Sequence, residues 1–171
     1  TNGLGKTTEL EYLPHTAYQA ADKEAGNPWT DVAPFPVQVV SRMTVRDNLG
    51  AAYVTEYAYR DALYDGVEAE FRGFADVTVR TVGDANSPTS LSRTIFWRGE
   101  RPAGSDPDDN PYEALKGAVR MTESCDEAGV CLETGHTTYR VRRLYDGVAG
   151  ETRSVWFAYA EQSDTFRYDT S

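Results

Sequence analysis

The chain has 171 residues and a formal net charge of −10, with 26% charged and 40% hydrophobic residues. This acidity argues against nucleic acid or an anionic membrane surface as a partner, because phosphate groups bind to basic faces. No apolar run is long enough to span a bilayer, and no signal peptide is visible. Since the chain starts at Thr1 without a Met, we expect it to be a fragment of a longer protein.

Composition favours strands over helices. Eleven tyrosines, three tryptophans and many Thr and Val residues are typical of β-sheets, whereas amphipathic runs of good helix formers are scarce. We predict a mainly β fold built from antiparallel hairpins, as a twisted sheet or a sandwich-like arrangement. Three parts are expected: a first hairpin subdomain over 1–82, a strand and mobile acidic loop over 83–110, and a short helix with a second hairpin subdomain over 111–171.

The first predicted strand covers residues 7–13 and ends at Pro14. Just before it, Gly5-Lys6-Thr7 matches the tail of a phosphate-binding P-loop. That motif needs an earlier Gly, a preceding strand and a following helix, whereas an alternating strand pattern follows here. A turn leading into a strand is the better interpretation.

Residues 15–36 are predicted to form a long polar connection, with Trp29 and Phe35 as its apolar contacts. Residues 37–46 alternate between apolar and polar side chains, which predicts a strand. The sequence Asp-Asn-Leu-Gly over 47–50 is a turn signal, and the return strand begins at Ala51.

The most regular pattern covers residues 53–79. Tyr53, Thr55, Tyr57 and Tyr59 share one face of a predicted strand. A turn is expected over 61–66, where Asp65 can bond its own backbone and Gly66 can take a positive φ. After the turn the alternation changes phase, so we predict a β-bulge at Gly73.

The run Y-D-G-V-E-A-E-F-R-G-F over 64–74 resembles the YDG…REFRGF signature of the B components of insecticidal Tc toxin complexes, which related Rhs and YD-repeat proteins share. Ala69 stands where that family more often has Arg, so the salt bridge of that Arg is not expected here. Weaker similarity extends from Asn2 to Tyr145. The signature residues are Tyr64, Asp65, Gly66, Glu70, Phe71, Arg72, Gly73 and Phe74.

In the second half, residues 91–98 are a predicted strand and residues 99–110 a mobile polar loop. Asn110 as an N-cap, Pro111 at the first helical position and Glu113 predict a short helix over 111–116. Strands follow over 118–124, 130–134, 137–145 and 152–160, with a second Tyr-Asp-Gly unit at 145–147.

Candidate sites for chemistry are weak. Asp106, Asp108 and Asn110 have the first spacings of a calcium loop, but Pro and Gly occupy its later positions, so a solvated acidic loop is expected. His15 and His136 lie in no catalytic or zinc-binding motif. We therefore predict a chain that is not an enzyme and that has no cofactor or metal site.

Cys125 and Cys131 flank a predicted hairpin turn. A disulfide across that hairpin fits the usual Cα separation. The alternative is a pair of free thiols, as in a protein made in the cytosol.

The resemblance implies a function. In the Tc family, B and C components form a hollow β-shell that holds the cytotoxic C-terminal region until a pore delivers it. The chain would then be a structural wall segment of a secreted toxin. Its implied partners are neighbouring shell segments, a C-type or Rhs protein and the enclosed effector. An alternative is a carbohydrate- or receptor-binding β-module of a large secreted protein, which would expose some of the aromatics Tyr53, Tyr57, Tyr59, Tyr64, Phe71, Phe74, Trp156, Phe157 and Tyr159.

Overall fold

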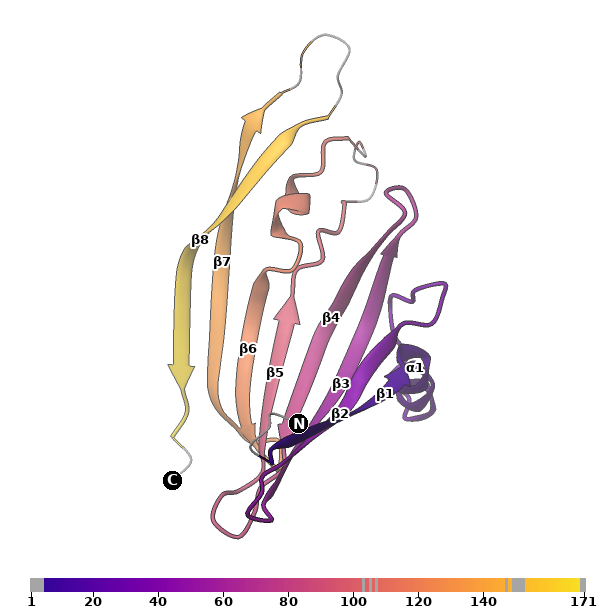
Figure 1. The fold of residues 1–171 in the computed structure, drawn as a ribbon. Coiled ribbons are helices and arrows are strands. Elements are labelled where there is room, and N and C mark those ends of the chain that lie inside the picture. Colours follow the sequence, from indigo (N-terminus) through magenta and orange to yellow (C-terminus); the bar gives the residue numbers. More distant parts are fainter. Residues whose placement is uncertain are drawn as a thin grey trace.

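The computed structural model describes residues 5–102, 104, 106, 108–146, 148 and 153–169. Within them, eight strands form one antiparallel sheet whose spatial order follows the chain order (Figure 1). The strands are β1 (Thr7–Pro14), β2 (Gln38–Arg46), β3 (Ala52–Asp65), β4 (Glu70–Thr81), β5 (Ser90–Phe96), β6 (Val119–Asp126), β7 (Cys131–Tyr145) and β8 (Val155–Arg167). The predicted mainly β class is confirmed, in the form of a single twisted sheet rather than a sandwich.

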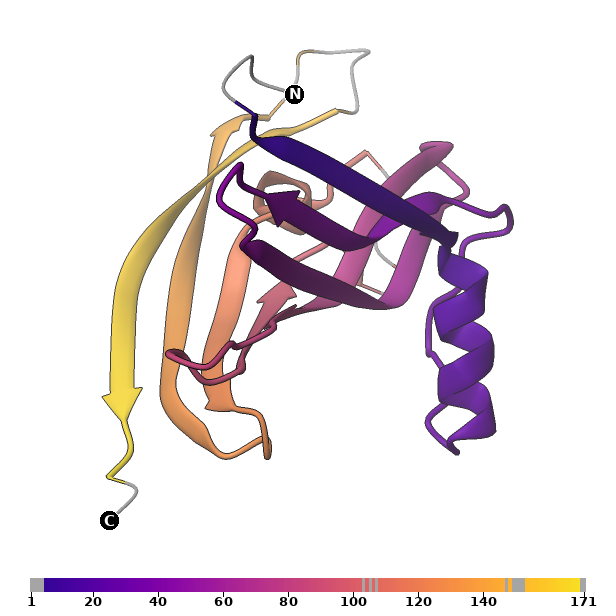
Figure 2. The same cartoon turned by 60° about the horizontal axis from the view of Figure 1, so that its bottom comes forward.

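The sheet is strongly twisted and open. Figure 2 shows β1 and β2 running at a steep angle to β7 and β8, as the right-handed twist of successive strands requires. In the described part of the chain, β1 pairs only with β2, and β8 pairs only with β7. The sheet therefore has two free edges.

The predicted loop over 15–36 is wrong in its first part, because a helix, α1 (His15–Glu24), follows β1 directly. Its N-cap is Pro14, which makes no side-chain capping bond, and its first turn has no acidic residue, so the usual start signals are missing. The Tyr18 hydroxyl donates to the Tyr57 carbonyl oxygen at 2.8 Å, which fixes α1 to β3. Among the described residues, no helix is both long and apolar enough to cross a membrane.

The turn of the β3–β4 hairpin lies later than predicted. β3 continues through Asp61, which has a φ of 55°, and ends at Asp65. As expected, an Asp65 carboxylate oxygen accepts from the amides of Val67 at 2.9 Å and Glu68 at 3.2 Å. The non-glycine residue with positive φ in this turn is Ala69, at 53°, whereas Gly66 was expected to take that conformation.

The bulge predicted at Gly73 is confirmed. Leu63 pairs with Gly73 but Tyr64 pairs with Phe71, so Arg72 is the extra residue, and Gly73 has a φ of 90°. The extra residue changes the phase of β4. Phe71 and Phe74 consequently share a face, and their ring centroids lie 5.5 Å apart.

The main core lies between β3–β4 and the segment made of α1 and the loop after it. Its buried members are Trp29, Ala33 and Ala62. Partly buried aromatic rings pack against them: Tyr18, Tyr64, Phe71 and Phe74. This main core therefore lies on the β1–β4 half of the sheet, whereas Leu115 of η1 and Cys125 of β6 are buried outside it.

The short helix expected over 111–116 is confirmed as a 3₁₀ turn, η1 (Pro111–Leu115), in which the Asn110 side chain accepts from the Tyr112 amide at 3.1 Å. The two strands predicted over 130–134 and 137–145 form one strand, β7, and the last strand starts at Val155. The second Tyr-Asp-Gly unit includes Gly147, which lies outside the described residues. The division of the chain into three parts at residues 82 and 110 stays a prediction. Strand pairing crosses both boundaries, because β4 pairs with β5 and β5 pairs with β6.

Candidate functional site

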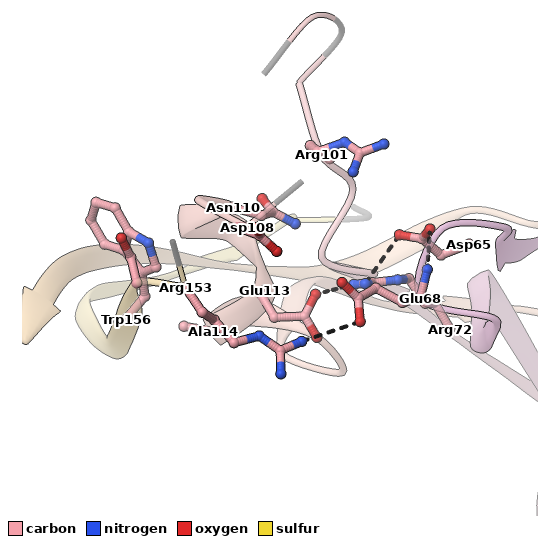
Figure 3. A pocket seen from close by; sticks show the side chains of 11 residues that line it. Asp65, Glu68, Arg72, Arg101, Asp108, Asn110, Glu113, Ala114, Arg153 and Trp156 are labelled. Atoms are coloured by element: carbon pink, nitrogen blue, oxygen red, sulfur yellow. Dashed lines mark hydrogen bonds and ion pairs between the residues drawn. The ribbon is translucent and has the colours of Figure 1, made fainter. Parts of the chain in front are cut away.

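The signature residue Arg72 is the centre of a buried charge cluster. The bulge directs its side chain, which is only 1% exposed, toward η1 and toward the loop that follows β5. Its guanidinium contacts the Asp65 carboxylate at 3.1 Å and forms an ion pair with Glu113 (Figure 3). It also donates to the Gly99 carbonyl oxygen at 3.2 Å. Arg72 thereby joins the β3–β4 turn to two segments that lie more than 25 residues later in the chain.

The surroundings keep the acidic members of this cluster charged. Burial raises the pKa of the Asp65 carboxyl, but the amides of Glu68 and Val67 and the charges of Arg72 and Arg101 outweigh burial, so the net pKa is lowered. For Glu113, burial is likewise outweighed by bonds from Lys116 and Arg72, which lower its pKa. Both carboxylates therefore remain ion-pair partners at neutral pH.

Glu70 of the signature extends the cluster to η1. The Lys116 ammonium lies 2.8 Å from a Glu70 carboxylate oxygen and 2.9 Å from one of Glu113. Its hydrogen bonds with Glu113 and Glu70 raise the pKa of Lys116. We call Asp65, Glu70, Arg72, Glu113 and Lys116 the Arg72 cluster.

Gly99 is required by the same packing. It has a φ of 71°, and a Cβ built on it would lie 2.7 Å from an Arg72 guanidinium nitrogen. A larger residue would be strained by its own backbone and would displace the arginine.

A second buried arginine, Arg98, was not singled out from the sequence. Its guanidinium donates to the Asp61 carbonyl oxygen at 2.7 Å, contacts the Asp31 carboxylate at 2.9 Å and pairs with Glu100. The Asp61 carboxylate in turn accepts from the Thr30 amide at 2.7 Å. Arg98 thus connects the end of β5 to the loop after α1, and no local sequence pattern indicates this long-range contact.

The remaining signature residues are structural. Tyr64, Phe71 and Phe74 supply aromatic contacts to the core, with Phe35 meeting Tyr64 edge to face at 5.1 Å. Gly66 lies in the hairpin turn, and Gly73 forms the bulge. The signature therefore encodes a turn, a bulge, an aromatic cluster and a buried ion pair.

The two cysteines close the β6–β7 hairpin. Cys125 near the end of β6 and Cys131 at the start of β7 are joined by a disulfide, with their Cα atoms 3.8 Å apart. The bond spans the turn over 127–130.

A cavity of about 160 Å³ lies beside the Arg72 cluster (Figure 3). Its lining includes Asp65, Glu68, Arg72, Arg101, Asp108, Asn110, Glu113, Arg153, Ser154 and Trp156. Neither histidine belongs to this lining, so Ser154 has no imidazole beside it to act as a general base.

The other candidates from the sequence lie elsewhere. Gly5-Lys6-Thr7 leads directly into β1, where a P-loop needs a helix, so that alternative is wrong. The Asn110 side chain, in the candidate calcium loop, donates to the Gly99 carbonyl oxygen and caps η1. Among the described residues, no group of three or more potential ligands could hold a metal ion.

Comparison with known proteins gives a consistent result. Nearly all of the chain, 98–99%, superposes on three solved structures at a TM-score of 0.79–0.82. Two are crystal structures, of TcdB2-TccC3 (21% sequence identity) and of TcdB2-TccC3 without its hypervariable C-terminal region (20%). The third is the structure of a Photorhabdus luminescens Tc holotoxin pore (19%). The chain spans 10% of each matched chain. No curated protein matches. Residues 1–95 match the sequence model of the insecticide toxin TcdB middle/N-terminal region. Since that match covers more than half of the chain, the chain belongs to this family, a region of the Tc toxin B component.

Proposed function

We propose that this chain is a structural segment in the wall of a Tc-type toxin shell, which encloses a cytotoxic effector before its delivery. The proposed partners are neighbouring wall segments, a C component such as the TccC3 that accompanies TcdB2 in the matched structures, and the effector. The segment carries no catalytic step, and the toxin acts after secretion.

The openness of the sheet supports this proposal most directly. The chain exposes 10,973 Å² of surface, whereas a compact monomer of 19.0 kDa exposes about 8,400 Å². Each edge strand, β1 and β8, lacks a paired strand on its outer side in the described part of the chain. A sheet with surplus surface and free edges is suited to continue into neighbouring sheet on both sides.

Exposed apolar side chains on β7 and β8 support the same conclusion. They include Leu132, Leu144, Tyr145, Val155, Phe157, Tyr159 and Phe166. Soluble monomers rarely leave so many large apolar groups uncovered on adjoining strands, and such surfaces mark contacts with other protein. Wall neighbours or the effector would cover them.

Protection of the effector tests the proposal. In the full toxin assembled with its C component, limited proteolysis should leave the effector intact. The Trp29→Ala change, which removes the largest core side chain, should make the effector cleavable at protease concentrations that spare the unmodified assembly. A Tyr53→Ser change at an exposed ring serves as the control. Equal protection with a disrupted segment, or cleavage of the effector in the unmodified assembly, would contradict a wall role.

A second candidate function rests on one observation. Phe157 and Tyr159 on β8 are 50% and 40% exposed, and their rings stack at 6.1 Å with an interplanar angle of 28°. Such a pair can stack on sugar rings. Binding of the chain to a glycan array that is lost in a Phe157→Ala, Tyr159→Ala variant would favour the carbohydrate-binding module over the wall.

A further inference from the structure

One row of alternating charges crosses the sheet at right angles to the strands. We call it the ion-pair ladder: Glu11 on β1, Arg42 on β2, Glu56 on β3, Arg80 on β4 and Glu127 in the turn after β6. Strand pairing places the first four directly opposite one another, Glu11 to Arg42, Arg42 to Glu56, and Glu56 to Arg80. Opposite charges at such positions stabilise strand pairing.

The spacing of the ladder becomes looser toward β1. Arg80 lies 2.7 Å from Glu127 and 2.8 Å from Glu56. Arg42 lies 3.8 Å from Glu56 and 3.9 Å from Glu11. The ladder therefore ends at the free edge on a carboxylate that has a cation on one side only.

A second carboxylate lies on the same face of β1. Glu9 pairs with Thr44 and is two residues from Glu11, so both side chains point to the ladder face. Among the described residues, Glu9 has no ion-pair partner. Of the two carboxylates on the edge strand, Glu11 therefore shares the Arg42 guanidinium with Glu56, and Glu9 contacts no cation among the described residues.

The opposite face of β1 is apolar and exposed. Leu10 and Tyr12 alternate with the two glutamates and are 44% and 56% exposed. The backbone on the free side of β1 has no strand to bond in the described part of the chain. An edge strand with free backbone groups is a template for another strand.

We propose that the free edge of β1 binds a β-strand that carries Lys or Arg beside Glu9 and Glu11, alternating with apolar side chains beside Leu10 and Tyr12. This strand belongs to the same toxin assembly outside residues 1–171, so the inference rests on the proposed wall function. The basic side chains continue the charge alternation, and the apolar ones cover Leu10 and Tyr12.

The β8 edge does not offer the same chemistry. Its Glu161 forms an ion pair with Arg140 of β7, and Arg167 lies 2.8 Å from Glu133 of β7. Each of these β8 charges has a partner in the same hairpin, and the Asp164 carboxylate accepts from the Gln162 side chain, whereas Glu9 of β1 has no such partner among the described residues.

Photo-crosslinking identifies the partner strand. A benzoylphenylalanine replaces the exposed Tyr12 in the full-length assembled toxin, and mass spectrometry locates the attached peptide. We expect a segment outside residues 1–171 in which Lys or Arg alternates with apolar residues. Attachment to a strand without a basic residue would overturn the inference and leave the wall function intact. Failure to attach to any segment outside this chain would contradict both.

Charge reversal then tests the ladder itself. A Glu9→Lys, Glu11→Lys variant should lower the crosslinking yield about fivefold, because attraction across the strand pair becomes repulsion. Reversing the identified basic residues to Glu in the same protein should restore the yield. Glu24→Lys, at the exposed end of α1, is the control and should leave the yield unchanged. A yield that does not respond to reversal, or that the second reversal fails to restore, would overturn the charge recognition.

Discussion

The β3–β4 hairpin is covered by α1 and the loop after it, whereas the β7–β8 hairpin has only η1 and its flanking residues against it in the described part of the chain. The first hairpin contributes Ala62, Tyr64, Phe71 and Phe74 to the core. The second is built from longer strands whose large apolar side chains are mostly exposed. One sheet therefore has a half that packs against its own helix and loop and a half whose large apolar side chains are mostly exposed.

Removing an aromatic side chain from each half should give the largest contrast. Trp29→Ala should lower the free energy of unfolding by about 4 kcal/mol, because Trp29 is 8% exposed, stacks on His15 at 5.9 Å and bonds Asp22. Phe157→Ala, at a half-exposed ring, should cost about 0.5 kcal/mol. Urea unfolding followed by circular dichroism measures both. Equal losses would mean that the β7–β8 half has a core of its own.

Substitution of the buried Arg72 should give the next largest loss of stability. Arg72→Met leaves Asp65 and Glu113 without their shared cation and should lower the free energy of unfolding by about 3 kcal/mol. Arg80→Met is the matched control, since Arg80 also has two carboxylate partners but lies in the exposed ladder, and its loss should be much smaller. The same urea titrations measure the difference. Equal losses would show that burial adds nothing to the Arg72 cluster.

Loss of the disulfide between β6 and β7 should lower the stability by a moderate amount. Cys125→Ser with Cys131→Ser opens a short loop in the unfolded chain and should lower the free energy of unfolding by about 2 kcal/mol. Differential scanning calorimetry with and without a reducing agent measures the effect. Reduction of the unmodified chain should match the double substitution, and an unchanged Tm in both would contradict a stabilising crosslink.

Strand order was predictable because it depends on local alternation. The period-two patterns of 37–46 and 53–79, the turn at 47–50 and the phase change at Gly73 each determine backbone shape within a few residues. Consecutive hairpins then produce a sheet in chain order. The short η1 was equally visible, because Asn110 and Pro111 are local signals.

The missed features depend on long-range contacts. α1 has no capping bond, and contacts with β3 hold it in place. Asp61 adopts a positive φ within β3, where its backbone oxygen accepts from Arg98 and its carboxylate from the Thr30 amide. Residues that signal a turn locally were thus incorporated into a strand. The Arg72 cluster is a further example. The signature that contains Arg72 is recognisable in the sequence, but its ion pair with Glu113, 41 residues later, is not.

Acid sensitivity of the covered half is the smallest effect we expect, and it centres on His15. This side chain is fully buried, and its Nδ1 accepts from the Val37 amide at 3.0 Å, so the ring is neutral in the folded protein. Burial lowers the pKa of His15, so the unfolded chain binds the proton more readily. The stabilisation is therefore fully present above the ordinary histidine pKa of about 6.5 and is lost as pH falls toward the lower folded pKa. Because the pKa values of Asp65 and Glu113 are lowered from 3.8 and 4.5, their contributions are lost only at more acidic pH.

Urea unfolding at a series of pH values between 7.5 and 5.5 isolates this contribution. The stability of the unmodified chain should stay nearly constant down to about pH 6.5 and should fall as the pH is lowered further. His15→Asn keeps an acceptor for the Val37 amide but cannot take up a proton, so its free energy of unfolding should be lower at pH 7.5 and nearly independent of pH over this range. His136→Asn, which removes an exposed imidazole, is the matched control for the loss of a ring. If the stability of His15→Asn fell with pH as much as that of the unmodified chain, the acid sensitivity would have to come from groups other than His15.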